Sequence, residues 1–163
     1  MADILILAVE DEPEVRDALE RDLSEFAGVF ALEMADDAEE ASTVVAEYLD
    51  AGTSLGLVLA DHVLPGVTGV DLLVSLHQSP DTTKAKKILI TGQASHADTI
   101  RAINEANLSF YIAKPWDPEN LCRAVREALT AYVIETVDNV LPYVGVLDGA
   151  ALMDVVRTRL SDR

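Results

Sequence analysis

The apolar residues of this chain fall into short unbroken runs, separated by segments in which apolar residues recur at intervals of three and four. A short apolar run between turn residues is typical of a strand that is buried on both faces of a sheet. Five such strands are predicted, at Ile4–Val9, Val29–Met34, Leu55–Ala60, Lys86–Thr91 and Phe110–Ala113. Because strands and helices alternate, we predict an α/β fold with a parallel sheet, helices on both faces and right-handed crossovers.

The intervening segments predict five helices, which begin near Pro13, Ala38, Val70, His96 and Pro118. Asp36 or Asp37 can cap the second helix, since aspartate is favoured at that position. In the fourth helix, expected from His96 to Ala106, we place Ile100 and Ile103 on the inward face. Each of the first four helices connects two parallel strands, and the helices are expected to cover the two faces of the sheet.

Polar side chains stand where the predicted strands end. Glu10 and Asp11 follow the first strand, Asp61 follows the third, Thr91 ends the fourth, and Lys114 follows the fifth. The carboxyl ends of parallel strands meet at one edge of a sheet, where open α/β folds bind their ligands. We therefore expect these five side chains to lie close together.

Three carboxylates at one edge repel one another and favour a bound cation. Oxygen ligands with room for water suit Mg²⁺, and the open positions of such an ion can accept a phosphoryl group. The Thr91 hydroxyl could then donate a hydrogen bond to a phosphoryl oxygen, and Lys114 could supply a positive charge. No Ser-His or Cys-His pair is evident, so the candidate nucleophile is a carboxylate, which can form an acyl phosphate.

The composition of the chain restricts which partners it can bind and in which cellular compartment it is expected. The chain has 163 residues, half of them hydrophobic, which is one domain of ordinary size. Its 12 basic and 29 acidic residues leave a net charge of −17, which repels nucleic acid and anionic membranes. Cys122 is the only cysteine, and no apolar stretch has the length of a signal or membrane-spanning segment. We expect a cytoplasmic protein that binds neither nucleic acid directly nor membranes.

Four stretches of the chain match one protein family in their order and approximate spacing. They are VEDEPEVR at Val9–Arg16, LADHVLPGVTG at Leu59–Gly69, LITG at Leu89–Gly92 and YIAKPW at Tyr111–Trp116. Over roughly Ile4 to Tyr132 the chain resembles a two-component response-regulator receiver domain of the CheY-like kind. The resemblance implies the flavodoxin-like strand order 2-1-3-4-5. It also implies a signalling phosphoacceptor, not an enzyme, that is phosphorylated by a sensor histidine kinase or a phosphotransfer protein.

The resemblance also assigns roles to the polar residues at the strand ends. It implies that Asp61 is the phosphoacceptor and that Mg²⁺ is held by Asp61, by Asp11, by Glu10 through water, and by the backbone carbonyl of Val63. Contacts to the phosphoryl group and the conformational switch are implied for Thr91, Gly92, Lys114, Tyr111 and Pro115, the last through a cis peptide bond. Asp is more usual in the family at the position of Glu10, although the longer side chain can still reach an outer-shell water.

An alternative function is that of a pseudo-receiver, a scaffold that acts by protein–protein interaction without phosphorylation. The intact carboxylates, hydroxyl and lysine at the strand ends argue against it, because a scaffold need not keep them all. A phosphatase of the haloacid dehalogenase type carries its nucleophile on the first strand and a second Asp two residues later, a pattern that the segment from Glu10 to Pro13 does not fit. We interpret His62, next to Asp61, as a residue at the edge of the site rather than a catalytic base.

Residues 133–163 lie beyond the resemblance and are interpreted as a helical extension of a receiver domain at residues 1–132. The valines from Val133 to Val144 continue the spacing of the preceding helix, which Pro142 should kink or end. A further helix is expected from about Gly149 to Leu160. The apolar stripes of these helices predict a homodimer or, as the rival arrangement, a tail that folds back on its own domain.

Overall fold

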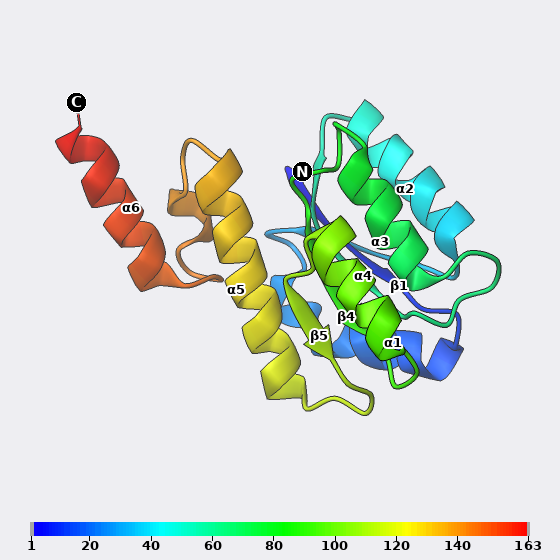
Figure 1. The fold of residues 1–163 in the computed structure, drawn as a ribbon. Helices are drawn as coiled ribbons and strands as arrows, with labels where there is room; N and C mark the ends of the chain where they lie inside the picture. Colours follow the sequence, from blue (N-terminus) through cyan, green and yellow to red (C-terminus); the bar gives the residue numbers. More distant parts are fainter. Residues whose placement is uncertain (1, 163) are drawn as a thin grey trace.

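The computed structural model describes residues 2–162 and contains a five-stranded parallel sheet (Figure 1). The strands are β1 (Ile4–Val9), β2 (Ala31–Ala35), β3 (Ser54–Ala60), β4 (Lys86–Ile90) and β5 (Phe110–Ile112). Their order across the sheet is β2-β1-β3-β4-β5 and every pairing is parallel, which confirms the predicted fold class and strand order. All the carboxyl ends therefore lie along one edge of the sheet.

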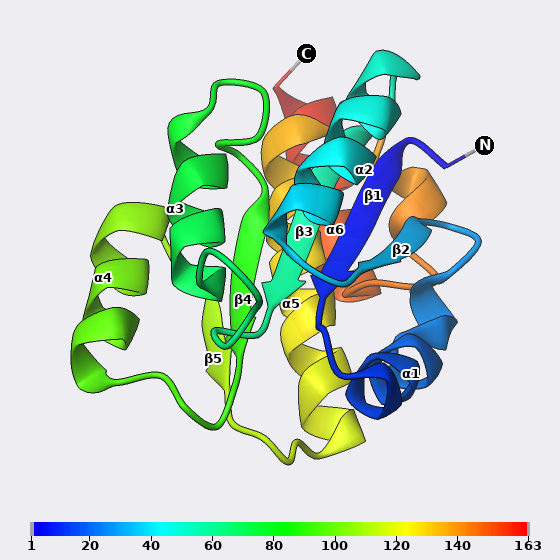
Figure 2. The same ribbon diagram turned by 90° about the vertical axis from the view of Figure 1, so that its right-hand side faces the viewer.

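Five helices cover the two faces of this sheet (Figure 2). They are α1 (Pro13–Asp22), α2 (Ala38–Asp50), α3 (Gly69–Gln78), α4 (His96–Ala106) and α5 (Pro118–Thr136). Helices α1 and α5 pack on one face, and α2, α3 and α4 pack on the other. Asp37 caps α2, because its side chain accepts a hydrogen bond from the Glu40 amide at 2.8 Å. No described helix has the length and apolar character that crossing a membrane would require.

The two helical layers explain why the strands are apolar at consecutive positions. In β1, alternate side chains from Ile4 to Ala8 join the cluster beneath α1 and α5. The others, from Leu5 to Val9, join the cluster beneath α2 and α3. All six side chains are at most 2% exposed, so no position on this strand faces water. A strand covered on both faces therefore shows no alternation of polar and apolar residues.

The structure contradicts the inward placement of Ile100 and Ile103 on α4. Their side chains are 55% and 52% exposed, and α4 instead buries Ala102 and Ala106, which lie one turn apart. Helix α4 packs against α3, and small alanine side chains allow the two helices to approach closely. The isoleucines are left on the outer face because the alanine stripe fits the neighbouring helix.

Helix α5 ends earlier than the valine spacing predicts. It stops at Thr136, and Val137 already has an extended backbone with ψ of 129°. A 3₁₀ turn (Leu141–Tyr143) and a final helix, α6 (Gly149–Ser161), follow. The chain thus leaves the helix at Val137, before the break that Pro142 predicts, and the predicted final helix is confirmed.

The extension packs against its own domain. Val140, Tyr143, Leu147 and Leu152 are at most 7% exposed and belong to the same apolar cluster as α1 and α5. The ring of Tyr143 stacks on that of Phe30, with the ring centroids 5.5 Å apart. This inward packing is the physical reason why the chain leaves the helical path after α5. The tail thus adopts the back-folded arrangement, and the homodimer stays a prediction.

Candidate functional site

Three carboxylates meet at the carboxyl edge of the sheet. Glu10 and Asp11 follow β1, and Asp61 follows the neighbouring strand β3. Each residue offers one oxygen, and these oxygens all lie within 4.8 Å of one another. Glu10 and Asp61 are almost fully buried, at 1% and 4% exposure, whereas Asp11 is partly exposed. The ends of two adjacent strands thus bring the acidic residues together, with Asp11 on the side toward solvent.

Lys114 reaches this acidic cluster from the end of β5, across the ends of β4 and β3. Its Nζ donates hydrogen bonds to Glu10 Oε1 at 2.6 Å and to Asp61 Oδ2 at 2.9 Å. Its backbone amide lies 3.4 Å from the Thr91 carbonyl oxygen, which ties the end of β5 to that of β4. The Lys114–Pro115 peptide bond is cis, as the resemblance implied. One lysine therefore bridges two of the three carboxylates.

Burial and charge pairing distribute protons unequally within the cluster. Burial raises the pKa of Glu10 to about 7, against the opposing effect of its hydrogen bond with Lys114. Burial also acts to raise the pKa of Asp61, but hydrogen bonds, led by that from Lys114, hold this pKa below its ordinary value. Burial acts to lower the pKa of Lys114, yet its two carboxylate partners raise it. Asp61 is therefore ionised at neutral pH and lies beside a charged lysine.

The oxygen atoms of the cluster fit a divalent cation. Glu10 Oε2 is buried and has no hydrogen-bond partner among residues 2–162. The Val63 amide donates to Asp61 Oδ1 at 3.3 Å, which places the backbone of Val63 beside the carboxylate. Carboxylate and carbonyl oxygens are the ligands that Mg²⁺ prefers in proteins. A bound divalent cation would give the buried oxygen a partner and would neutralise the surplus negative charge of the cluster.

Thr91 and Tyr111 form a hydrogen-bonded pair beside the acidic cluster. Thr91 directly follows β4 and is buried, and its Oγ1 accepts a hydrogen bond from the Gln93 amide at 3.3 Å. The Tyr111 hydroxyl donates to the Thr91 carbonyl oxygen at 3.1 Å, although Tyr111 is 41% exposed. Gly92 packs against the next loop, where a Cβ on it would lie 3.7 Å from the Lys114 carbonyl oxygen. These residues line the site on the side of β4 and β5.

The loop after β3 folds tightly over Asp61 and requires glycine where it enters α3. A Cβ on Gly69 would overlap the Asp61 carbonyl oxygen. The Gly69 amide donates to the His62 carbonyl oxygen at 3.0 Å, which closes the loop. Gly66, within the loop, has φ of 81°, a conformation that other residues rarely adopt. This closure holds the Asp61 carboxylate at the edge of the sheet.

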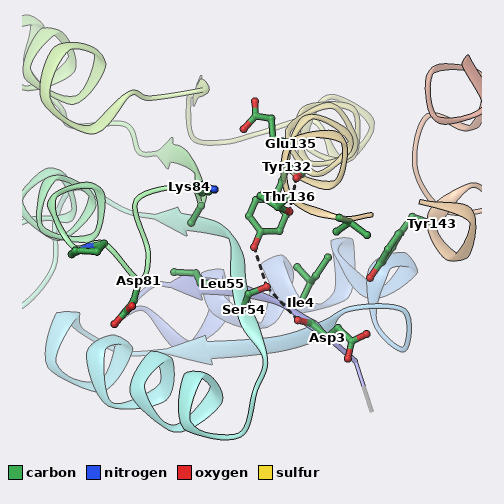
Figure 3. A pocket seen from close by; sticks show the side chains of 13 residues that line it. Asp3, Ile4, Ser54, Leu55, Asp81, Lys84, Tyr132, Glu135, Thr136 and Tyr143 are labelled. Carbon is green, nitrogen blue, oxygen red and sulfur yellow. Dashed lines mark hydrogen bonds between the residues drawn. The ribbon is translucent and has the colours of Figure 1, made fainter. Parts of the chain in front are cut away.

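A separate pocket lies at the opposite edge of the sheet, near the amino end of β3 (Figure 3). The Tyr132 hydroxyl donates to Ser54 Oγ at 2.9 Å, and Ser54 Oγ donates to the Asp3 carbonyl oxygen at 3.3 Å. Charges of both signs line the pocket, among them Lys84 and Glu135. None of the strand-end carboxylates lines it, so it is not part of the acidic site.

Two carboxylates near the site were not singled out from the sequence. Asp71 and Asp98 complete capping boxes at the starts of α3 and α4. The pattern of Ser or Thr followed three residues later by an acidic residue could have found this capping role. It could not have found their second partners, since Asp71 pairs with Arg101 and Asp98 with His62. Those contacts depend on how α3 and α4 pack together.

Comparison with known proteins places the chain in a family. Residues 6–126 match the family model of the response regulator receiver domain. The chain is 34% identical over 127 residues to the hydrogenase transcriptional regulatory protein HoxA of Cupriavidus necator, a match that covers 77% of this chain and 24% of that protein. It is 33% identical over 130 residues to the transcriptional regulatory protein AruR of Pseudomonas aeruginosa, covering 76% and 51%. The chain thus spans between about a quarter and a half of these relatives' length.

Solved structures agree with this assignment. The signal receiver domain of an HD domain-containing protein from Pseudomonas fluorescens is 29% identical with a TM-score of 0.73, covering 85% of this chain and 96% of that one. A CheY-like response regulator receiver domain from Methanospirillum hungatei is 30% identical with a TM-score of 0.68, covering 80% and 97%. The family match spans more than half of the chain and contains the whole acidic cluster. This chain belongs to the response regulator receiver domain family of two-component signalling.

Proposed function

We propose that this chain accepts a phosphoryl group on Asp61 from a phosphohistidine of a sensor histidine kinase or a phosphotransfer protein. The observation that carries the proposal is the position of Lys114 Nζ, which is 2.9 Å from Asp61 Oδ2 and 2.6 Å from Glu10 Oε1. It keeps the buried Asp61 ionised and beside a positive charge. A carboxylate in this state can act as the nucleophile, and the lysine can stabilise the charge of the incoming group.

In the proposed reaction a carboxylate oxygen of Asp61 attacks the phosphorus atom of the phosphoimidazole. The P–N bond breaks as the new P–O bond forms, and the imidazole leaves as a neutral base because its other ring nitrogen carries a proton. The Thr91 hydroxyl and the Gly92 amide, both directly after β4, donate hydrogen bonds to phosphoryl oxygens. Lys114 donates to another, so that fixed donors surround the charge that the transfer brings into the site.

The acidic cluster would hold Mg²⁺ beside the acceptor. Its ligands would be Asp61, Asp11, the Val63 carbonyl and, through water, Glu10. When bound, the ion supplies charge neutralisation between the carboxylates and the phosphoryl oxygens. Two observations support this assignment. Oε2 of Glu10 is buried and unpaired among the described residues, and one oxygen from each of the three carboxylates lies within 4.8 Å of the other two.

A phosphoryl group on Asp61 would also change the surface formed by α4 and β5. Thr91 gains a new partner, and the Tyr111 hydroxyl must follow because it donates to the Thr91 carbonyl oxygen. Tyr111, Ile100 and Ile103 are exposed hydrophobic side chains on these two elements. We propose that a partner protein reads the phosphorylation state on this surface.

Treatment of the full chain with acetyl phosphate and Mg²⁺, followed by Phos-tag electrophoresis, tests the acceptor. The wild-type chain should give a retarded band that is absent from Asp61→Asn and from samples containing EDTA. Asp17→Asn is the matched control, because Asp17 is exposed on α1 and lies outside the cluster, and it should label like the wild type. Labelling of Asp61→Asn would contradict the proposal. An unlabelled wild-type chain would favour the pseudo-receiver.

A further inference from the structure

The capping aspartates of α3 and α4 each make a second contact across the gap between these helices. Asp71 and Asp98 occupy the same position in the first turn of their helices, and both complete reciprocal capping boxes. Asp71 Oδ1 lies 2.5 Å from Nη1 of Arg101 on α4. Asp98 Oδ2 lies 3.1 Å from Nε2 of His62, in the loop before α3. An ion pair therefore connects α4 with α3, and a contact between a carboxylate and an imidazole connects α4 with the loop that follows β3.

His62 is the member of this arrangement that adjoins the acidic site. It directly follows Asp61, and its carbonyl oxygen accepts a hydrogen bond from the amide of Gly69, the first residue of α3. Its side chain is 12% exposed, and Nδ1 is buried without a hydrogen-bond partner in the part of the chain that the structure describes. A buried ring nitrogen without a partner is unfavourable. The ring is held there by its other nitrogen, through the contact with Asp98.

The contact between His62 and Asp98 can be removed without removing the cap of α4. Asp98 Oδ2 also accepts a hydrogen bond from the Ser95 hydroxyl at 2.8 Å, and the Asp98 amide donates to Ser95 Oγ at 3.1 Å. These bonds do not involve His62. A substitution of His62 therefore cuts the tie to the loop while the start of the helix keeps its own hydrogen bonds.

We propose that His62 is a positioning residue that couples the Asp61 loop to the first turn of α4. The inference rests on the proposed function, since the movement that it transmits begins with a phosphoryl group on Asp61. On the other side of His62, the Val63 amide donates to Asp61 Oδ1 at 3.3 Å, so a change at that carboxylate displaces the backbone on both sides of His62. The ring passes this displacement to Asp98 and so to α4, whose outer face carries the exposed isoleucines.

Amide hydrogen exchange, measured by NMR on the unphosphorylated full chain, tests whether the contact between His62 and Asp98 stabilises the first turn of α4. His62→Leu removes the contact with Asp98, and exchange at Thr99 and Arg101 should become roughly two- to fivefold faster, the factor expected when a partly exposed polar side-chain contact is lost. His62→Gln keeps a donor near the position of Nε2 and should restore most of the protection. His96→Leu is the matched control, because His96 is exposed at the start of the same helix, and it should leave exchange unchanged.

Beryllofluoride with Mg²⁺, a mimic of a phosphoryl group bound to a carboxylate, tests the coupling in the same samples. In the wild type, amide shifts should change in the Asp61 loop and in the first turn of α4. In His62→Leu the loop shifts should persist while those of α4 become much smaller. Unchanged exchange in α4, or undiminished α4 shifts, would overturn the proposal. If the wild type showed no shift near Asp61, the proposed function would fail, and the exchange comparison would still decide whether His62 ties the loop to α4.

Discussion

Lys87 is a buried charge that lies outside the acidic site. On β4 its side chain is 1% exposed, and its Nζ lies 3.1 Å from His77 Nδ1 and donates to the Thr83 carbonyl oxygen at 3.0 Å. Neither of these partners carries a negative charge. Burial lowers the pKa of Lys87 to about 8, because the low-polarity surroundings disfavour the ammonium form.

We predict that Lys87→Met raises the free energy of unfolding at pH 7 by up to about 3 kcal/mol, at about 1.4 kcal/mol per unit of pKa shift. Below about pH 8 the lysine is charged in both states, so its burial opposes folding in full. Between about pH 8 and 10.5 the folded chain has released a proton that the unfolded chain still binds, so the wild type gains stability as the pH rises.

Urea unfolding of both chains at pH 7 and pH 9.5 measures this effect. The stability difference between Lys87→Met and the wild type should shrink at the higher pH, because the wild-type lysine is then largely neutral in the folded state. Titrating groups that do not contact Lys87 are common to both chains and cancel in the difference. A difference that is the same at both pH values would contradict the account of Lys87.

The candidate site residues were predictable one by one, but their contacts were not. Glu10, Asp61, Thr91 and Lys114 could be assigned to one edge because each stands at the end of an apolar run. The double contact of Lys114 and the unpaired Oε2 of Glu10 were not predictable, since they depend on side-chain positions at the ends of three strands. The sequence places His62 only at the edge of the site, because its partner Asp98 lies too far along the chain for spacing to indicate the pair.

At the scale of single elements, α6 holds the end of α5 through one arginine. The Arg159 guanidinium donates to the carbonyl oxygens of Ile134, Val137 and Asp138, at distances between 2.7 and 3.0 Å. The last carbonyls of a helix have no partner within it, and positive charge near that end is favourable. The extension is therefore docked to α5 by polar contacts as well as by its buried apolar residues.

We predict that Arg159→Ala lowers the free energy of unfolding by about 1–2 kcal/mol, because it leaves three carbonyls, in the last turn of α5 and just after it, without their donor. Arg157→Ala is the matched control on the same helix, since Arg157 is exposed and pairs with Asp154 one turn away. That change should stay within about 0.5 kcal/mol of the wild type. Urea unfolding of the three chains measures both effects. An equal decrease in the free energy of unfolding in both variants would show that the Arg159 contacts do not stabilise the end of α5.

Element boundaries were predictable where apolar runs and helix caps agree. β1 runs from Ile4 to Val9 as predicted, but β2 starts two residues later than its apolar run, because Val29 follows Gly28 in a turn and is 38% exposed. The orientation of α4 was not predictable, since the spacing of four between Ala102 and Ala106 and the spacing of three between Ile100 and Ile103 are both helical. A local turn decides the start of β2, whereas the contact with α3 decides the orientation of α4, and the pattern of apolar residues contains neither.

At the scale of the whole molecule, the acidic site and the extension lie at opposite edges of the sheet. The site is at the carboxyl ends of the strands, whereas Val137 and Tyr143 of the extension line the pocket near the amino ends of β1 and β3 (Figure 3). The back-folded tail therefore leaves the acidic edge accessible to a phosphoryl donor. The parallel sheet was predictable from the alternation of strand and helix patterns along the chain, but the path of residues 137–162 was not. That route depends on contacts such as Tyr143 with Phe30, more than a hundred residues apart.

The central claim is that Asp61 is the residue that carries the phosphoryl group, and peptide mapping tests it most directly. After treatment with acetyl phosphate and Mg²⁺, borohydride reduction converts an aspartyl phosphate to homoserine, which marks the acceptor stably for mass spectrometry. We predict homoserine at position 61 in the wild type and at no position when EDTA replaces Mg²⁺. Homoserine at Asp11 or at another aspartate, with Asp61 unmodified, would contradict the account.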